Sequence, residues 1–179
     1  MVMMAPRGLT CQASLFTDEA LLGRFANRPY RFPFTNRSPE ADKETQMPNT
    51  HTNPAAVSKP GAYTHVVEAT GSRIVFISGQ VALDKDGNVV GPGDLAKQTE
   101  QVFRNLQACL AGAGATFADV TKMTTFIVGY QAARDRAVLG AVRQKYLPAE
   151  DPPASTLVGV QALATPDIMI EIEAMAVLA

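Results

Sequence analysis

The 179-residue sequence has no tryptophan, two histidines and two cysteines. A Ser-His-Asp or Cys-His catalytic arrangement would have to use His51 or His65, and neither lies near a nucleophile motif. Cys11 and Cys109 do not have metal-ligand spacing, so we expect two free thiols and no metal site. No run of residues approaches the roughly eighteen apolar residues of a membrane span. These absences and the lack of a secretory signal favour a cytoplasmic protein.

The sequence also lacks an excess of charge of either sign. Its formal net charge is -1, and charged residues make up 18% of the chain. A protein that binds nucleic acid or an anionic membrane through charge normally carries a basic patch or stripe. We therefore expect neither nucleic acid nor membrane as a partner.

Residues 1–60 differ from the rest of the chain, because they contain seven of its twelve prolines. Proline at this density interrupts regular structure repeatedly. One short helix is predicted over residues 18–25, with Thr17 as its N-cap. We interpret residues 1–60 as an N-terminal extension that is disordered, or in which the protein truly starts at Met47 and the residues before it are dispensable. A transit peptide is the alternative, although Asp18 and Glu19 argue against it.

Regular periodicity begins at Tyr63 and predicts a domain over residues 61–179 with the order β-β-α-β-α-β-β. Gly79 interrupts the strongest strand, which indicates a bulge or a close approach by another group. Cys109 falls on the apolar stripe of the first helix, so we expect it to be buried. The strands are predicted over residues 64–69, 73–82, 119–128, 154–160 and 168–177, and the helices over residues 94–113 and 132–146.

These elements predict an α+β fold in which both helices cover one face of a mixed sheet. The other face keeps enough apolar side chains to indicate an interface, so we expect a homo-oligomer with pockets at its subunit seams. Side chains alternate between faces along a strand, and in the last strand Glu171 and Glu173 share one face with two methionines. A buried carboxylate needs a partner, so at least one of these glutamates should face solvent, a seam or a pocket. A half-exposed strand with solvated glutamates is the simpler alternative.

Several runs resemble the RidA/YjgF (Rid) family in order and spacing from Tyr63 to Val177. They are Phe76-Ile-Ser-Gly-Gln-Val81, Asp119-Val-Thr-Lys122, Pro152-Pro-Ala-Ser155 and Ile170-Glu-Ile-Glu-Ala-Met-Ala176. The resemblance implies a chorismate-mutase-like fold, assembled as a homotrimer around a barrel of sheets, with small-molecule sites in the clefts between subunits. It also implies hydrolysis of reactive 2-imino and 2-enamino acids to 2-keto acids and ammonia, without a metal or cofactor.

The resemblance assigns roles to particular residues. Glu171 matches the site glutamate, and a carboxylate in a cleft is suited to moving protons during imine hydrolysis. Tyr63 matches a tyrosine that lines the cleft. Ser78 and Gly79 match a wall segment that hydrogen-bonds the substrate.

One departure concerns the family's Pro-Ala-Arg-Ser run, whose arginine clamps the substrate carboxylate. We assign Ala154 to the arginine's place, with Ser155 and Thr156 completing the substrate-side segment. Arg143, on the second helix, is a candidate replacement for the missing guanidinium. A solvated position on the helix surface is the alternative for Arg143.

Three functions remain open from the sequence. The first is a Rid-type hydrolase or deaminase, and the second is a non-catalytic trimer that binds a small metabolite. The third is a ribonuclease, which the net charge of -1 and the absence of a basic stripe disfavour.

Overall fold

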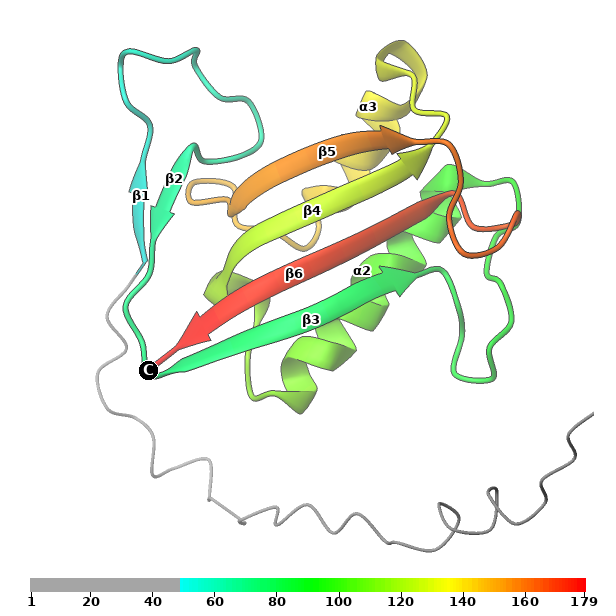
Figure 1. The fold of residues 1–179 in the computed structure, drawn as a ribbon, viewed down its shortest axis with the longest axis horizontal. Coiled ribbons are helices and arrows are strands. Elements are labelled where there is room, and N and C mark those ends of the chain that lie inside the picture. Colours follow the sequence, from blue (N-terminus) through cyan, green and yellow to red (C-terminus); the bar gives the residue numbers. More distant parts are fainter. Residues whose placement is uncertain (1–48) are drawn as a thin grey trace, which may run out of the picture. The chain divides into compact units, whose positions relative to one another are not determined.

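A computed structural model describes residues 49–179. They form a four-stranded sheet with two helices on one face and a smaller two-stranded sheet beside it (Figure 1). The elements are β1 (Thr50–Thr52), β2 (Val66–Glu68), β3 (Arg73–Val81), α2 (Leu95–Gly112), a 3-10 turn (Phe117–Asp119), β4 (Val120–Val128), α3 (Ala132–Arg143), β5 (Ala154–Val160) and β6 (Ile170–Leu178).

The large sheet has the strand order β3-β6-β4-β5. The last strand, β6, lies inside the sheet and pairs antiparallel with both β3 and β4, whereas β4 and β5 are parallel. The parallel pair requires a crossover connection, and α3 supplies it. The α+β class and the element order predicted from residue 61 onward are therefore confirmed.

Alternation along β6 separates the two faces of the sheet. Ile170, Ile172 and Ala174 are at most 3% exposed beneath the helices. Glu171 and Glu173 point to the other face, which we call the open face. The alternation predicted from the sequence is confirmed.

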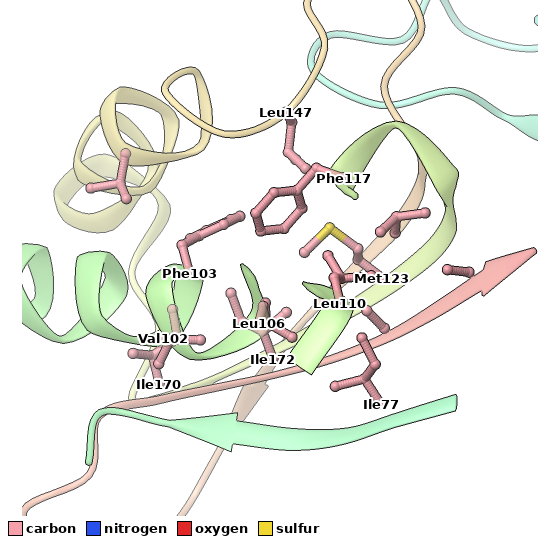
Figure 2. Packing of buried hydrophobic residues seen from close by; sticks show 14 of the residues in the cluster. Ile77, Val102, Phe103, Leu106, Leu110, Phe117, Met123, Leu147, Ile170 and Ile172 are labelled. Atoms are coloured by element: carbon pink, nitrogen blue, oxygen red, sulfur yellow. The ribbon is translucent and has the colours of Figure 1, made fainter. Parts of the chain in front are cut away.

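Helix α2 packs its apolar stripe onto the helical face of the sheet. Val102, Phe103 and Leu106 are fully buried, and Figure 2 shows them among the core side chains above β6. The Asp94 side chain caps the helix by accepting a hydrogen bond from the Lys97 N–H. Cys109 is exposed, so its predicted burial is wrong. Leu110 occupies the inner edge of the stripe at that turn, which leaves Cys109 facing solvent.

Strand β1 was not predicted, since its three residues are too few to show an alternating pattern. It pairs antiparallel with β2, with His51 opposite Val67. The predicted strand over residues 64–69 is shorter in the structure, and α3 ends at Arg143, before the predicted residue 146. The helix predicted over residues 18–25 lies outside the described residues.

The open face of the large sheet carries large apolar side chains. Phe76 is 72% exposed and Ile74 is 60% exposed on β3, and Met175 and Val158 add to the same face. Contiguous exposed apolar surface of this kind usually marks an interface. The apolar far face predicted from the sequence is present.

Gln98 is a buried polar link between α2 and the turn that precedes β6. Its amide nitrogen donates to the Asp167 carbonyl at 2.7 Å and to the Gly91 carbonyl at 3.3 Å. Its amide oxygen accepts from the Met169 N–H at 2.8 Å. The side chain is 0% exposed, so these three bonds satisfy a group that water cannot reach.

We expect Gln98→Leu to lower the free energy of unfolding by roughly 1–3 kcal/mol, because it leaves the Met169 N–H and the Asp167 carbonyl without partners. Urea denaturation measures the change. The matched control is Gln107→Leu, on the exposed side of the same helix, which should change stability by less than about 0.5 kcal/mol. Equal effects of the two substitutions would contradict the role given to Gln98.

Candidate functional site

The predicted site residues form two groups on opposite faces of the large sheet. Tyr63, Arg143 and Ser155 line a cavity on the helical face. Ser78, Gly79 and Glu171 lie on the open face or at its bulged strand. Within one chain, the two groups are therefore separated by the sheet.

We call the first site the helix-side cavity; its volume is about 240 Å³. Its walls are mainly apolar and aromatic, and they come from both helices, β4, β5, β6 and the segment before β2. Its apolar and aromatic lining residues are Tyr63, Phe103, Tyr130, Leu139, Leu157 and Ile172, and its polar ones are Thr125, Arg136, Arg143 and Ser155.

The register between β4 and β5 decides which residues of the Pro-Ala run reach the cavity. Met123 pairs with Ser155, and Met123 is fully buried toward the helices, so Ser155 faces the same way. Ala154 pairs with Lys122 and faces the open side. Ser155 is thus the residue of the Pro-Ala-Ser run that lines the cavity, and the assignment of Ala154 to the arginine's place stays a prediction.

Thr156, like Ala154, lies on the open face. Its hydroxyl accepts a hydrogen bond from the Lys122 ammonium group. The two neighbours of Ser155 thus point away from the cavity because side chains alternate along β5. Sequence reasoning treated these three residues as one segment, but the strand divides them between two faces.

Arg143, in the last turn of α3, directs its guanidinium to Ser155. Nη1 donates to Ser155 Oγ at 3.3 Å, and Nη2 donates to the Ala62 carbonyl at 3.3 Å. Burial lowers the pKa of Arg143. The side chain forms no ion pair with any carboxylate of residues 49–179. A partly buried guanidinium with only neutral acceptors is suited to binding an anion.

Thr125, on β4, is another polar residue of the cavity wall, and sequence reasoning missed it. The residue is 2% exposed, and its hydroxyl has no hydrogen-bond partner within the described part of the chain. A buried hydroxyl without a partner is costly. The sequence contains no signal for this role, because Thr124 and Thr125 are indistinguishable until the register is known.

The start of α3 is fixed by Asp135, whose side chain is buried. Its carboxylate accepts from the Gln131 N–H at 2.8 Å and from Arg134 Nη2 at 2.9 Å. The hydrogen bond from Arg134, together with that from Gln131, lowers the pKa of Asp135. These contacts hold the first turn of the helix whose last turn carries Arg143.

On the open face, Glu171 lies directly against Gly79. A Cβ added to Gly79 would overlap the Glu171 carboxylate, so the glycine makes room for that side chain. The register between β3 and β6 shifts between Ile77 and Gln80, which confirms the bulge predicted at Gly79. The carboxylate forms no hydrogen bond or ion pair with another residue of the described range. Ser78 lines a hollow of about 250 Å³ on the same face, together with Phe76 and Glu173.

Residues 49–179 contain no group of three or more His, Cys, Asp or Glu side chains arranged to hold a metal ion. None of the helices in this range is long and apolar enough to span a membrane.

We expect Asp135→Asn to lower the free energy of unfolding at pH 7 by roughly 1 kcal/mol, because the first turn of α3 loses a charged acceptor. A carboxylate with a lowered pKa stabilises the fold above its unfolded-state pKa, near 3.9, and this contribution disappears as the pH falls through the folded-state pKa. The difference between wild type and variant should therefore shrink below about pH 4. Denaturation curves between pH 3 and pH 7 measure it, and a gap that is independent of pH would contradict the assignment.

The strand order, the two helices on one face and the apolar open face define the α+β class found in Rid proteins. A family model described as endoribonuclease L-PSP matches residues 53–178. The chain belongs to this family, the RidA/YjgF family.

Individual relatives agree with this family. A RutC family protein from Pyrococcus horikoshii is 34% identical over 116 residues, which cover 65% of this chain and 86% of the relative. A solved structure of a Rid-family protein of unknown function from Yersinia pestis is 40% identical, with a TM-score of 0.66, and the match covers 74% of this chain and 100% of the other. RidA from an Antarctic Psychrobacter is 30% identical, with a TM-score of 0.52 and coverage of 67% and 91%.

Proposed function

We propose that this protein is a Rid-type hydrolase that converts reactive imine or enamine metabolites to carbonyl compounds and ammonia. The observation that carries the proposal is the unpaired carboxylate of Glu171, which lies directly against Gly79 on the open face. A carboxylate without a competing partner is free to exchange protons with a bound water and a substrate.

The reaction needs only water and a group that moves protons. Water attacks the carbon of the protonated imine while Glu171 accepts one of the water protons, which gives a neutral carbinolamine. The same carboxyl group then protonates the amino nitrogen. The C–N bond breaks as the carbonyl forms, the hydroxyl proton passes to Glu171 and on to solvent, and ammonia leaves. An enamine substrate first gains a proton on its β-carbon to become the imine. No metal or redox cofactor enters this balance.

The separation of the two groups of site residues favours a site built by two copies of the chain. A small substrate cannot contact both faces of one sheet. The apolar side chains of the open face, including Phe76 and Ile74, would be covered if a second copy packed there. One copy would then supply Glu171, Ser78 and Gly79, and its neighbour would supply Tyr63, Arg143 and Ser155. We propose a homotrimer with three such clefts, located in the cytoplasm.

A non-catalytic metabolite-binding trimer is the second candidate. The observation that favours it is the run Pro152-Pro-Ala-Ser155, which has no arginine where the family's deaminating members carry the carboxylate-binding one. In this case ligand would bind without being hydrolysed. Ammonia release separates the two candidates directly.

We expect the wild-type protein to accelerate ammonia release from 2-imino acids generated in the cuvette by an amino-acid oxidase. Glu171→Gln keeps the shape of the side chain but removes the proton acceptor, so the acceleration should fall by roughly 10²–10⁴-fold. Glu68→Gln, at an exposed position on β2, is the control and should keep wild-type activity. Equal activity of Glu171→Gln and wild type would remove Glu171 from the mechanism, and no acceleration by wild type would favour the binding protein.

A second prediction tests the contact between Gly79 and Glu171. Gly79→Ala should displace the Glu171 carboxylate and reduce activity by at least about tenfold. Its free energy of unfolding should change by less than about 1 kcal/mol, since the overlapped atoms are at the end of a flexible side chain. Combined with Glu171→Gln, the substitution should cause no further loss of activity, because both remove the same positioned group. Multiplicative effects of the two substitutions would show that Gly79 acts independently of Glu171.

A further inference from the structure

Two polar groups of the helix-side cavity, on Arg143 and Thr125, have bonding needs that are unmet within the described residues; Arg136 adds a further positive charge to the lining. One is the Arg143 guanidinium, which donates to two neutral oxygens and has no carboxylate partner. The other is the Thr125 hydroxyl, which is buried and has no hydrogen-bond partner. Both residues line the same space, so one molecule placed there can be close to both.

Arg143 sets the charge of the molecule that fits. A guanidinium that is partly withdrawn from water gains most from an anion, and its planar fork matches a carboxylate. Its present partners, Ser155 Oγ and the Ala62 carbonyl, lie 3.3 Å away, so they fix its direction with long, weak bonds. An organic carboxylate would provide the missing charge.

The walls set the body of the molecule. Tyr63, Tyr130, Leu139 and Leu157 give the cavity an apolar and aromatic lining. Its volume of about 240 Å³ exceeds the roughly 150 Å³ of an apolar cavity that holds benzene. The space therefore suits a ligand with a ring or a branched chain in addition to its charged group. A ligand whose body is only a methyl group would leave much of the cavity empty.

Gly140 contributes to this space. It lies inside α3, where glycine is a poor helix former, and it lines the cavity. A Cβ added to Gly140 would meet no atom within 4 Å. A larger side chain at this position can therefore extend into open space, which provides a way to fill the cavity without disturbing its walls.

We infer that the helix-side cavity binds carboxylic acids with a branched or aromatic body, held by Arg143 at the carboxylate and by Thr125 at a polar atom of the ligand. This inference rests on the proposed function and makes it more specific, because it names the substrates as 2-imino acids derived from bulky amino acids. The binding itself is measured without turnover.

The test is calorimetric titration of the full chain with stable keto compounds. Phenylpyruvate and 4-methyl-2-oxopentanoate should bind at least about tenfold more tightly than pyruvate, because only they fill the apolar space. Phenylacetone, which lacks the carboxylate, should bind at least roughly 30-fold more weakly than phenylpyruvate. Equal affinities for phenylacetone and phenylpyruvate, or for pyruvate and phenylpyruvate, would overturn the inference.

Variants test the two polar contacts. Arg143→Gln should weaken phenylpyruvate binding by at least roughly 30-fold, whereas Arg104→Gln, at an exposed position on α2, should leave it unchanged. Thr125→Val should weaken binding by about fivefold without lowering the melting temperature, because it removes a hydroxyl that has no partner in the fold. Thr125→Ser should restore the affinity. Wild-type affinity in Arg143→Gln overturns the carboxylate anchor, and wild-type affinity in Thr125→Val overturns the second contact.

Gly140→Leu separates binding from folding. It should abolish phenylpyruvate binding and keep or raise the melting temperature, since leucine is the better helix former. Unchanged binding in this variant would place the ligand outside the cavity. If only the hydrolase proposal is wrong, phenylpyruvate still binds and Arg143→Gln still weakens its binding, but the wild-type protein releases no ammonia from 2-imino acids.

Discussion

The two-residue period of the last strand is the constraint on which the rest of the structure depends. Strand β6 lies inside the sheet and pairs with both β3 and β4. Its isoleucines and alanines form the floor of the core, while Glu171 shares the opposite face with Met175. A slip of one residue would bury the carboxylate and expose the isoleucines, so the energy of the core also fixes the side of the sheet on which Glu171 stands.

The same rule, acting on β5, determines what the helix-side cavity contains. Ser155 points to the helices, and its neighbours Ala154 and Thr156 point away. The only side chain of this segment that lines the cavity is therefore the small hydroxyl of Ser155. The Arg143 guanidinium, on α3, donates a hydrogen bond to it. The proposed site therefore depends on the strand registers of β5 and β6 and on the last turn of α3, and no contiguous sequence motif contains it.

Most elements could be predicted from the sequence because their periodicity is strong. The stripe of α2 and the alternation of β6 each repeat over several turns or residue pairs, and tertiary packing reinforces both. Strand β1 was missed because three residues are too few to show a period. Cys109 was predicted to be buried because residue spacing alone does not show where the apolar stripe of a helix ends. The division of the site between two faces could not be predicted, since it depends on strand register. The Arg143–Ser155 and Thr125 observations are likewise contacts between elements, which a linear pattern does not contain.

The absence of an arginine from the Pro152-Pro-Ala-Ser155 run is physically compatible with recognition of a carboxylate by Arg143. An arginine at position 155 would bring a further guanidinium close to that of Arg143, whose Nη1 lies 3.3 Å from Ser155 Oγ, in a cavity that Arg136 also lines. Two like charges in a partly desolvated cavity repel each other strongly unless an anion separates them. A small hydroxyl at this position avoids the repulsion and accepts a hydrogen bond from Arg143. The two residues are therefore coupled: Ser155 gives Arg143 both the space and the acceptor that direct its charge into the cavity. Leu157, the next inward residue of β5, adds an apolar side chain to the same wall.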